Sequence, residues 1–82
     1  MKKENIMLQS GSTRMYLNAL VIRYEADMAN SKANMQTYFR NGVGVAEHPD
    51  IMKSIDDLME QFVNAQEKLN ATKEIMRELI GE

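Results

Sequence analysis

The residues best able to do chemistry gather in one short stretch, between Arg40 and Asp50. It holds the only histidine of the chain, His48, beside Glu47 and the only proline, Pro49. Glu47, His48 and Asp50 have side chains of the kinds that bind metal ions, and they lie within four residues. One loop with one imidazole is nevertheless weak evidence for a metal site. A proline and an aspartate at this spacing are typical of the first turn of a helix, where negative charge is favoured. We therefore predict a helix start here and no metal site.

The same stretch has features of an anion-binding loop. Gly42 and Gly44 precede the expected helix, and Arg40 is close in sequence, so backbone N–H groups and a guanidinium could surround a phosphate. Neither glycine adjoins the helix start, however, and turn geometry alone accounts for both. Binding of a small anion or nucleotide by Arg40, Gly42, Gly44 and His48 is therefore the alternative function, not the favoured one.

The residue types of the chain give little support for a catalytic function. The chain has one histidine and no cysteine, and its serines and threonines are scattered along expected helices without a nucleophile–base arrangement. Asp56, Asp57 and Glu60 are closely spaced carboxylates, but they lie mainly on the polar side of a helix, where a solvated face explains them. We predict that the chain is not an enzyme and uses no cofactor.

The composition describes one small domain. Eighty-two residues without cysteine exclude disulfides and thiolate metal sites. No apolar run approaches the length of a membrane span, and the N-terminal apolar run is too short for a signal peptide, so we expect a soluble, cytoplasmic protein. Residues 1–41 carry six basic and three acidic side chains, whereas residues 42–82 carry four and nine. This acidic second half makes nucleic acid an unfavourable partner.

The spacing of apolar residues predicts an all-α antiparallel two-helix hairpin that oligomerises into a helical bundle. We expect an N-terminal arm over residues 1–11 that ends at Gly11, and a hairpin domain over residues 12–82. Within that domain the prediction is a helix over 13–40, a connector over 41–48 and a helix over 49–80.

Each expected helix has an inner row of apolar residues at alternating three- and four-residue spacing. The rows are Leu17, Val21, Tyr24, Met28, Ser31, Met35 and Tyr38 in the first helix, and Ile51, Ile55, Leu58, Phe62, Ala65, Leu69, Thr72, Met76 and Leu79 in the second. A second apolar row on the first helix, here called the alanine seam, consists of Met15, Ala19, Ile22, Ala26, Ala29 and Ala33.

One partner helix can cover only one of these two rows. The bulkier inner row is the better match for the second helix, which leaves the alanine seam as the predicted oligomer interface. Its small side chains would let another helix approach closely. On the second helix, the methionine patch of Met52, Met59 and Val63 lies beside the inner row and is a predicted partner interface, since methionine suits adaptable binding surfaces.

The connector over residues 43–50 resembles a loop found in small uncharacterised proteins of tailed bacteriophages. In those proteins a helix rich in Ala, Glu and Lys leads through a Gly-Val-Gly-Glu-His-Pro loop to a second helix with a Leu/Ile row. The similarity spans residues 23–69, and this chain departs from it at Ala46, inserted before Glu47, and at Gly42, where proline is common. The resemblance implies a phage origin and transfers no functional residue.

The sequence therefore favours a non-enzymatic protein–protein interaction module. We expect it to associate with itself, most simply as a dimer, in the host cytoplasm if it is phage-encoded. It would act either as a virion or assembly component or as an inhibitor of a host protein.

Overall fold

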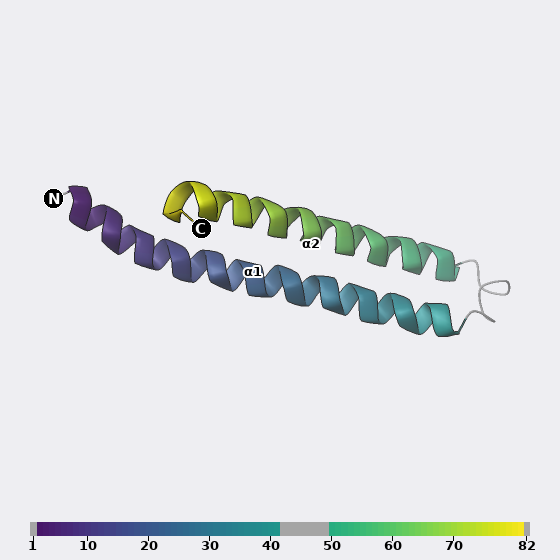
Figure 1. Ribbon diagram of the computed structural model, residues 1–82. Helices are drawn as coiled ribbons and strands as arrows, with labels where there is room; N and C mark the ends of the chain where they lie inside the picture. Colours follow the sequence, from purple (N-terminus) through teal and green to yellow (C-terminus); the bar gives the residue numbers. More distant parts are fainter. Residues whose placement is uncertain (1, 42–49, 82) are drawn as a thin grey trace.

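Two antiparallel helices make up the fold in a computed structural model of the chain. Helix α1 runs from Lys2 to Arg40 and α2 from Asp50 to Ile80, and they lie side by side (Figure 1). The structure describes the backbone of residues 2–41 and 50–81, and the side chains from residue 11 onward. No strand occurs in these ranges. The predicted all-α hairpin is confirmed, while the connector and Pro49 lie outside the described residues.

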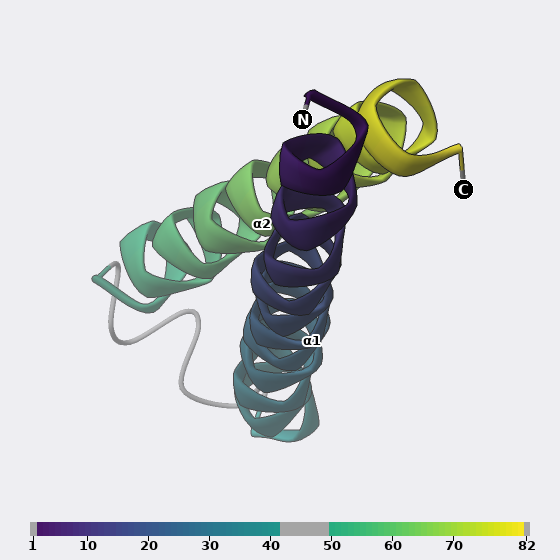
Figure 2. The same ribbon diagram turned by 90° about the vertical axis from the view of Figure 1, so that its left-hand side faces the viewer.

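The molecule is a rod of 66 × 15 × 14 Å. Its radius of gyration is 18.6 Å, whereas a compact domain of this length has a value of about 12 Å. Figures 1 and 2 show why: the two helices form one layer, and among the described residues no third element covers the line where they meet. The tertiary packing of this part of the chain therefore depends on a single contact between two helices.

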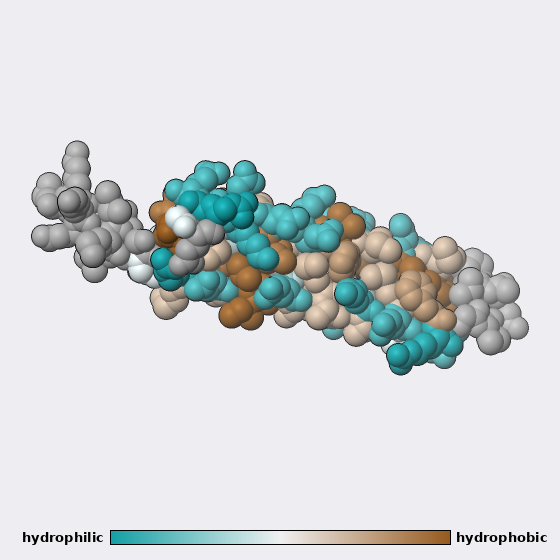
Figure 3. Space-filling view, viewed as in Figure 1, coloured by the Kyte–Doolittle hydropathy of each residue, from teal (hydrophilic) through white to brown (hydrophobic). Residues whose placement is uncertain are grey.

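The core is that contact line. The buried apolar side chains are Met35, Ala65, Leu69 and Met76, and the other members of both predicted inner rows are buried or half-buried, except Leu79, which is 64% exposed. The assignment of the bulkier row of α1 to α2 is thus confirmed. Hydrophobic residues remain visible on this face of the rod, interspersed with hydrophilic ones (Figure 3), because two helices cannot enclose the row between them.

Two polar residues interrupt the inner rows. Thr72 is buried, and its hydroxyl donates a hydrogen bond of 2.7 Å to the carbonyl oxygen of Lys68. Ser31 is only 2% exposed and lines the same groove as Ala65. A buried hydroxyl bonded to the preceding turn costs little, so Thr72 keeps its place in an otherwise apolar row.

Each helix ends with an identifiable cap. The Asn41 N–H donates to the carbonyl oxygens of Thr37 and Tyr38 at 3.3 and 3.1 Å. Gly81 has a φ of +75°, and its N–H donates to the carbonyl oxygen of Arg77 at 3.2 Å. This is the left-handed glycine that commonly ends a helix, and it explains why α2 stops at Ile80.

The N-terminal boundary differs from the sequence prediction. Helix α1 begins at Lys2 and passes through Gly11 without a break, which corrects the prediction of a separate arm over residues 1–11. A glycine inside a helix costs only about 1 kcal/mol relative to alanine, too little to end a helix that its neighbours continue. Because α1 has 39 residues and α2 has 31, the first turns of α1 extend past the C-terminal end of α2 (Figure 1).

Candidate functional site

The alanine seam lies on the side of α1 that faces away from α2. All six of its residues are exposed, and Met15 and Ile22 are 62% and 67% exposed. Each seam residue is offset by two positions from a residue of the inner row, which is about 200° around a helix. Packing of α1 on α2 therefore leaves the whole seam open, as the sequence predicted.

The methionine patch is also open. Met52, Met59 and Val63 are 56%, 46% and 38% exposed. They belong to α2, whereas the alanine seam belongs to α1, so their relative placement depends on how the two helices are aligned.

Two observations define that alignment. The Lys68 ammonium lies 5.9 Å from the centre of the Tyr24 ring, and Tyr38 lines a groove together with Ser54. The same antiparallel register sets Phe39 level with Met52, and it sets Ala29 level with Val63.

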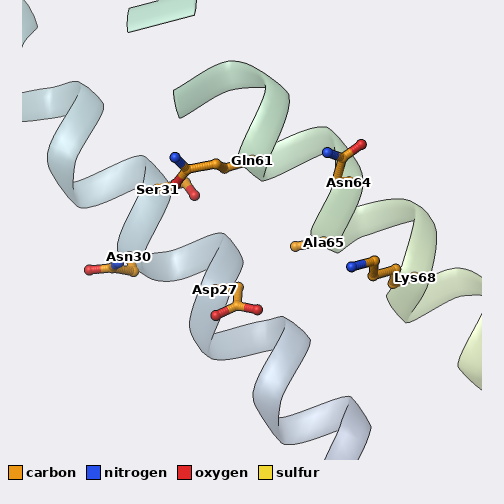
Figure 4. A pocket seen from close by; sticks show the side chains of 7 residues that line it. All are labelled: Asp27, Asn30, Ser31, Gln61, Asn64, Ala65 and Lys68. Atoms are coloured by element: carbon orange, nitrogen blue, oxygen red, sulfur yellow. The ribbon is translucent and has the colours of Figure 1, made fainter. Parts of the chain in front are cut away.

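One flank of the rod is polar. It contains two adjoining grooves of about 310 and 430 Å³ that share Gln61. In the first groove, side chains from both helices meet around Ser31 and Ala65 (Figure 4). Apart from Tyr38 and Leu58 of the inner rows, the remaining lining residues, which together with Gln61 define the polar flank, are Asp27, Asn30, Asn34 and Thr37 of α1 and Ser54, Asp57, Asn64 and Lys68 of α2.

These groups can form hydrogen bonds, but they do not form a catalytic arrangement. The polar flank contains carboxamides, hydroxyls, two carboxylates and one ammonium, and the residues lining both grooves include neither a histidine nor a cysteine. A nucleophile needs an adjacent base to activate it. The flank is therefore a hydrogen-bonding surface.

The other flank is apolar and draws on both helices. Residues one position before an inner residue lie about 100° to one side of it, whereas residues one position after it lie about 100° to the other side. The first relation places Asp27, Asn34 and Lys68 on the polar flank. The second relation places Phe39, Met52 and Met59 opposite. The exposed apolar residues on that side, here called the apolar flank, are Ile22, Ala29, Phe39, Met52, Met59 and Val63, and the exposed polar residues Glu25, Lys32, Gln36 and Asp56 lie among them.

Phe39 is the member of this surface that sequence reasoning missed. It is 60% exposed, although aromatic side chains are usually largely buried. It belongs to neither apolar row of α1, so a search for periodic rows passes over it. Its signal was its position four residues after Met35, which places it beside the inner row.

The structure describes only part of the predicted loop site. Arg40 is exposed at the last turn of α1, while Gly42, Gly44 and His48 lie outside the described residues. Asp50 is the acidic residue of the first turn of α2. Within the ranges that the structure describes, no three His, Cys, Asp or Glu side chains are grouped as a metal ion would require.

The carboxylates of α2 lie on its solvated face. Asp56, Asp57 and Glu60 are exposed, and Asp57 accepts a hydrogen bond of 3.1 Å from the Lys53 ammonium one turn earlier. Such exposed pairs along a helix contribute only about 0.3–0.5 kcal/mol. They have the role that the sequence assigned to them.

Comparison with protein-family models, with curated protein sequences and with solved structures gives no significant match for this chain. Across the part of the chain that the structure describes, neither helix has a stretch apolar enough to cross a membrane.

Proposed function

We propose that this chain is a non-enzymatic protein–protein interaction module that associates with itself. The observation that carries the proposal is the exposed alanine seam: after α1 and α2 have packed, six apolar residues over five helical turns still face solvent. Monomers rarely expose a contiguous apolar surface of this kind. Small side chains along the seam leave room for the backbone of another helix.

The surface area of the hairpin supports the same proposal. The accessible surface is 6432 Å² for a 9.4 kDa chain, whereas a compact monomer of that mass exposes about 5,000 Å². A standard interface buries about 800 Å² on each partner. Association through one such interface removes about half of the excess, and a four-helix bundle is the commonest closed arrangement for two hairpins.

The biological role proposed for the assembled hairpin follows from its resemblance to small bacteriophage proteins. An assembly of this kind acts in the host cytoplasm as a virion or assembly component, or it binds and inhibits a host protein. Exposed methionines suit the second role in particular, since their flexible side chains adapt to differently shaped partners. Both roles require protein contacts and neither requires a cofactor.

Light scattering coupled to gel filtration tests self-association directly. The expected mass at tens of micromolar is about twice the 9.4 kDa of one chain, and a higher multiple also agrees with the proposal. A monodisperse species of 9.4 kDa at that concentration would refute it.

The second candidate is binding of a small anion or nucleotide near the connector. Its support is the exposed Arg40 guanidinium at the end of α1, next to the predicted loop residues. Calorimetry separates the two functions, because an interaction module does not release heat with nucleotides whereas a ligand-binding protein does.

A further inference from the structure

We propose that the partner of the apolar flank is a second copy of this chain, with α1 of each copy packed on α2 of the other and the connector ends at the same end of the bundle. The inference rests on the proposed self-association, moves the main contact surface from the alanine seam to the apolar flank, which shares only Ile22 and Ala29 with the seam, and adds the orientation. Its residues are Ile22, Ala29, Phe39, Met52, Met59 and Val63.

Exposed apolar side chains favour this flank over the rest of the rod. Nine large apolar residues are exposed among the side chains described, and five of them belong to the apolar flank. The opposite flank carries the polar grooves. A four-helix bundle needs apolar surface from both helices of each hairpin, and the apolar flank supplies it, whereas the alanine seam alone involves only α1.

Charge complementarity identifies the occupant as another copy. Helix α1 carries six basic and three acidic side chains, a net charge of +3, and α2 carries four basic and seven acidic side chains, a net charge of −3. Packing α1 on the α2 of a second copy sets opposite net charges against each other. Packing α1 on α1 and α2 on α2 sets like charges together, which disfavours that arrangement.

The position of the apolar residues along the rod then decides the orientation. Phe39, Met52 and Met59 lie in the half next to the connector, and Val63 lies near the middle of α2. With the connector ends together, these three residues of one copy lie level with the same residues of the other copy. In the reverse orientation, with the rods fully overlapped, they meet the polar residues of the other half, Gln66, Asn70 and Lys73.

Matched substitutions of adjacent residues test the surface. Val63→Glu buries an unpaired charge on the apolar flank, whereas Asn64→Glu places the same charge on the polar flank. Ala29→Glu and Asn30→Glu are the corresponding pair on α1. We expect the apolar-flank variants to raise the dissociation constant of the dimer at least about tenfold, and the polar-flank variants to leave it unchanged. Because all four positions are exposed, circular dichroism should report unchanged helix content.

Spin labels test the orientation, and the absence of cysteine allows single labelling sites. Labels are placed at Asn41→Cys, beside the connector, and at Glu78→Cys, near the far end of α2. With connector ends together, both positions lie within about 30 Å of their counterparts, since the bundle is only about two helix diameters wide. In the reverse orientation at least one pair is separated by roughly 45 Å or more, because α2 has 31 residues with a rise of about 1.5 Å each.

The outcomes separate this inference from the proposed function. A monomeric wild-type chain overturns both. An oligomer that resists Val63→Glu and Ala29→Glu, or that is dissociated equally by their matched controls, overturns the surface but leaves self-association standing. A long distance at either label overturns the orientation alone.

Discussion

The ammonium of Lys68 lies over the ring of Tyr24, 5.9 Å from its centre. Tyr24 belongs to the inner row of α1, and Lys68 directly precedes Leu69 of the inner row of α2. The contact therefore joins the two helices at the edge of the core. It marks the register in which the two inner rows pack, and the alignment of the two flanks depends on that register.

We expect this pair to be energetically coupled. The double-mutant cycle of Tyr24→Leu and Lys68→Gln should give a coupling of about 0.5–1 kcal/mol, the usual size of a cation–π contact at an exposed site. Urea unfolding at one fixed protein concentration measures it. Tyr24→Phe keeps the aromatic face and should retain most of the coupling. Strictly additive effects of the two substitutions would show that the two side chains do not interact.

Truncation of the core should be far more costly than the same truncation at the end of α2. Leu69 is 7% exposed and Leu79 is 64% exposed. Leu69→Ala should lower the free energy of unfolding by about 2–5 kcal/mol, because it removes buried methyl groups and leaves a cavity. Leu79→Ala is the matched control and should change it by less than about 0.5 kcal/mol. Thermal denaturation followed by circular dichroism compares them, and equal effects would contradict the burial described here.

The two glycines at the open end of the rod should respond to alanine in opposite directions. An added Cβ meets no atom within 4 Å at either Gly11 or Gly81, but Gly81 has a φ of +75°. Gly11→Ala should therefore stabilise α1 by about 0.5–1 kcal/mol. Gly81→Ala should destabilise the end of α2 by about 1 kcal/mol, because a side chain resists the left-handed conformation. Helix content and unfolding midpoints of the two variants provide the measurement. A loss of helix in Gly11→Ala would mean that α1 is interrupted there after all.

Calorimetric titration with nucleotides distinguishes the two candidate functions. The protein–protein interaction proposal predicts no heat of binding for mono-, di- or cyclic nucleotides at micromolar concentrations. If heat is observed and is abolished by Arg40→Ala, the connector end is a ligand site and the alternative function is correct. Lys53→Ala removes a positive charge from the first turn of α2 and is the control for general charge effects.

Regular spacing is what made most of the hairpin predictable from the sequence. The inner rows, from Leu17 to Tyr38 and from Ile51 to Met76, persist over many turns, so local preference and packing agree. The boundary at Gly11 was not predictable in this way, because one glycine lowers helix propensity by less than its neighbours supply. The end of α2 at Gly81 could have been predicted, because a glycine directly after the last apolar residue is typical of a helix C-terminus.

The candidate surfaces likewise include one that could be predicted from the sequence and one that could not. Rows within one helix, such as the alanine seam, follow from the period of the helix and could be predicted as exposed. The apolar flank could not, because it joins Phe39 of α1 to Met52 and Met59 of α2. That relation depends on the register between the two helices, which the spacing of apolar residues within one helix does not determine.

The difference in charge between α1 and α2 gives the rod an electric dipole across its short axis. Along the long axis the macrodipoles of two antiparallel helices largely cancel, whereas the net charges of the two helices that lie side by side are +3 for α1 and −3 for α2. When a second copy pairs α1 with α2, the two transverse dipoles point in opposite directions and cancel. In the proposed pair, the transverse field that could attract a third copy is therefore reduced. Salt screens the fields of the free rods within about 10 Å at 0.1 M, so the proposed pairing should weaken as the ionic strength rises.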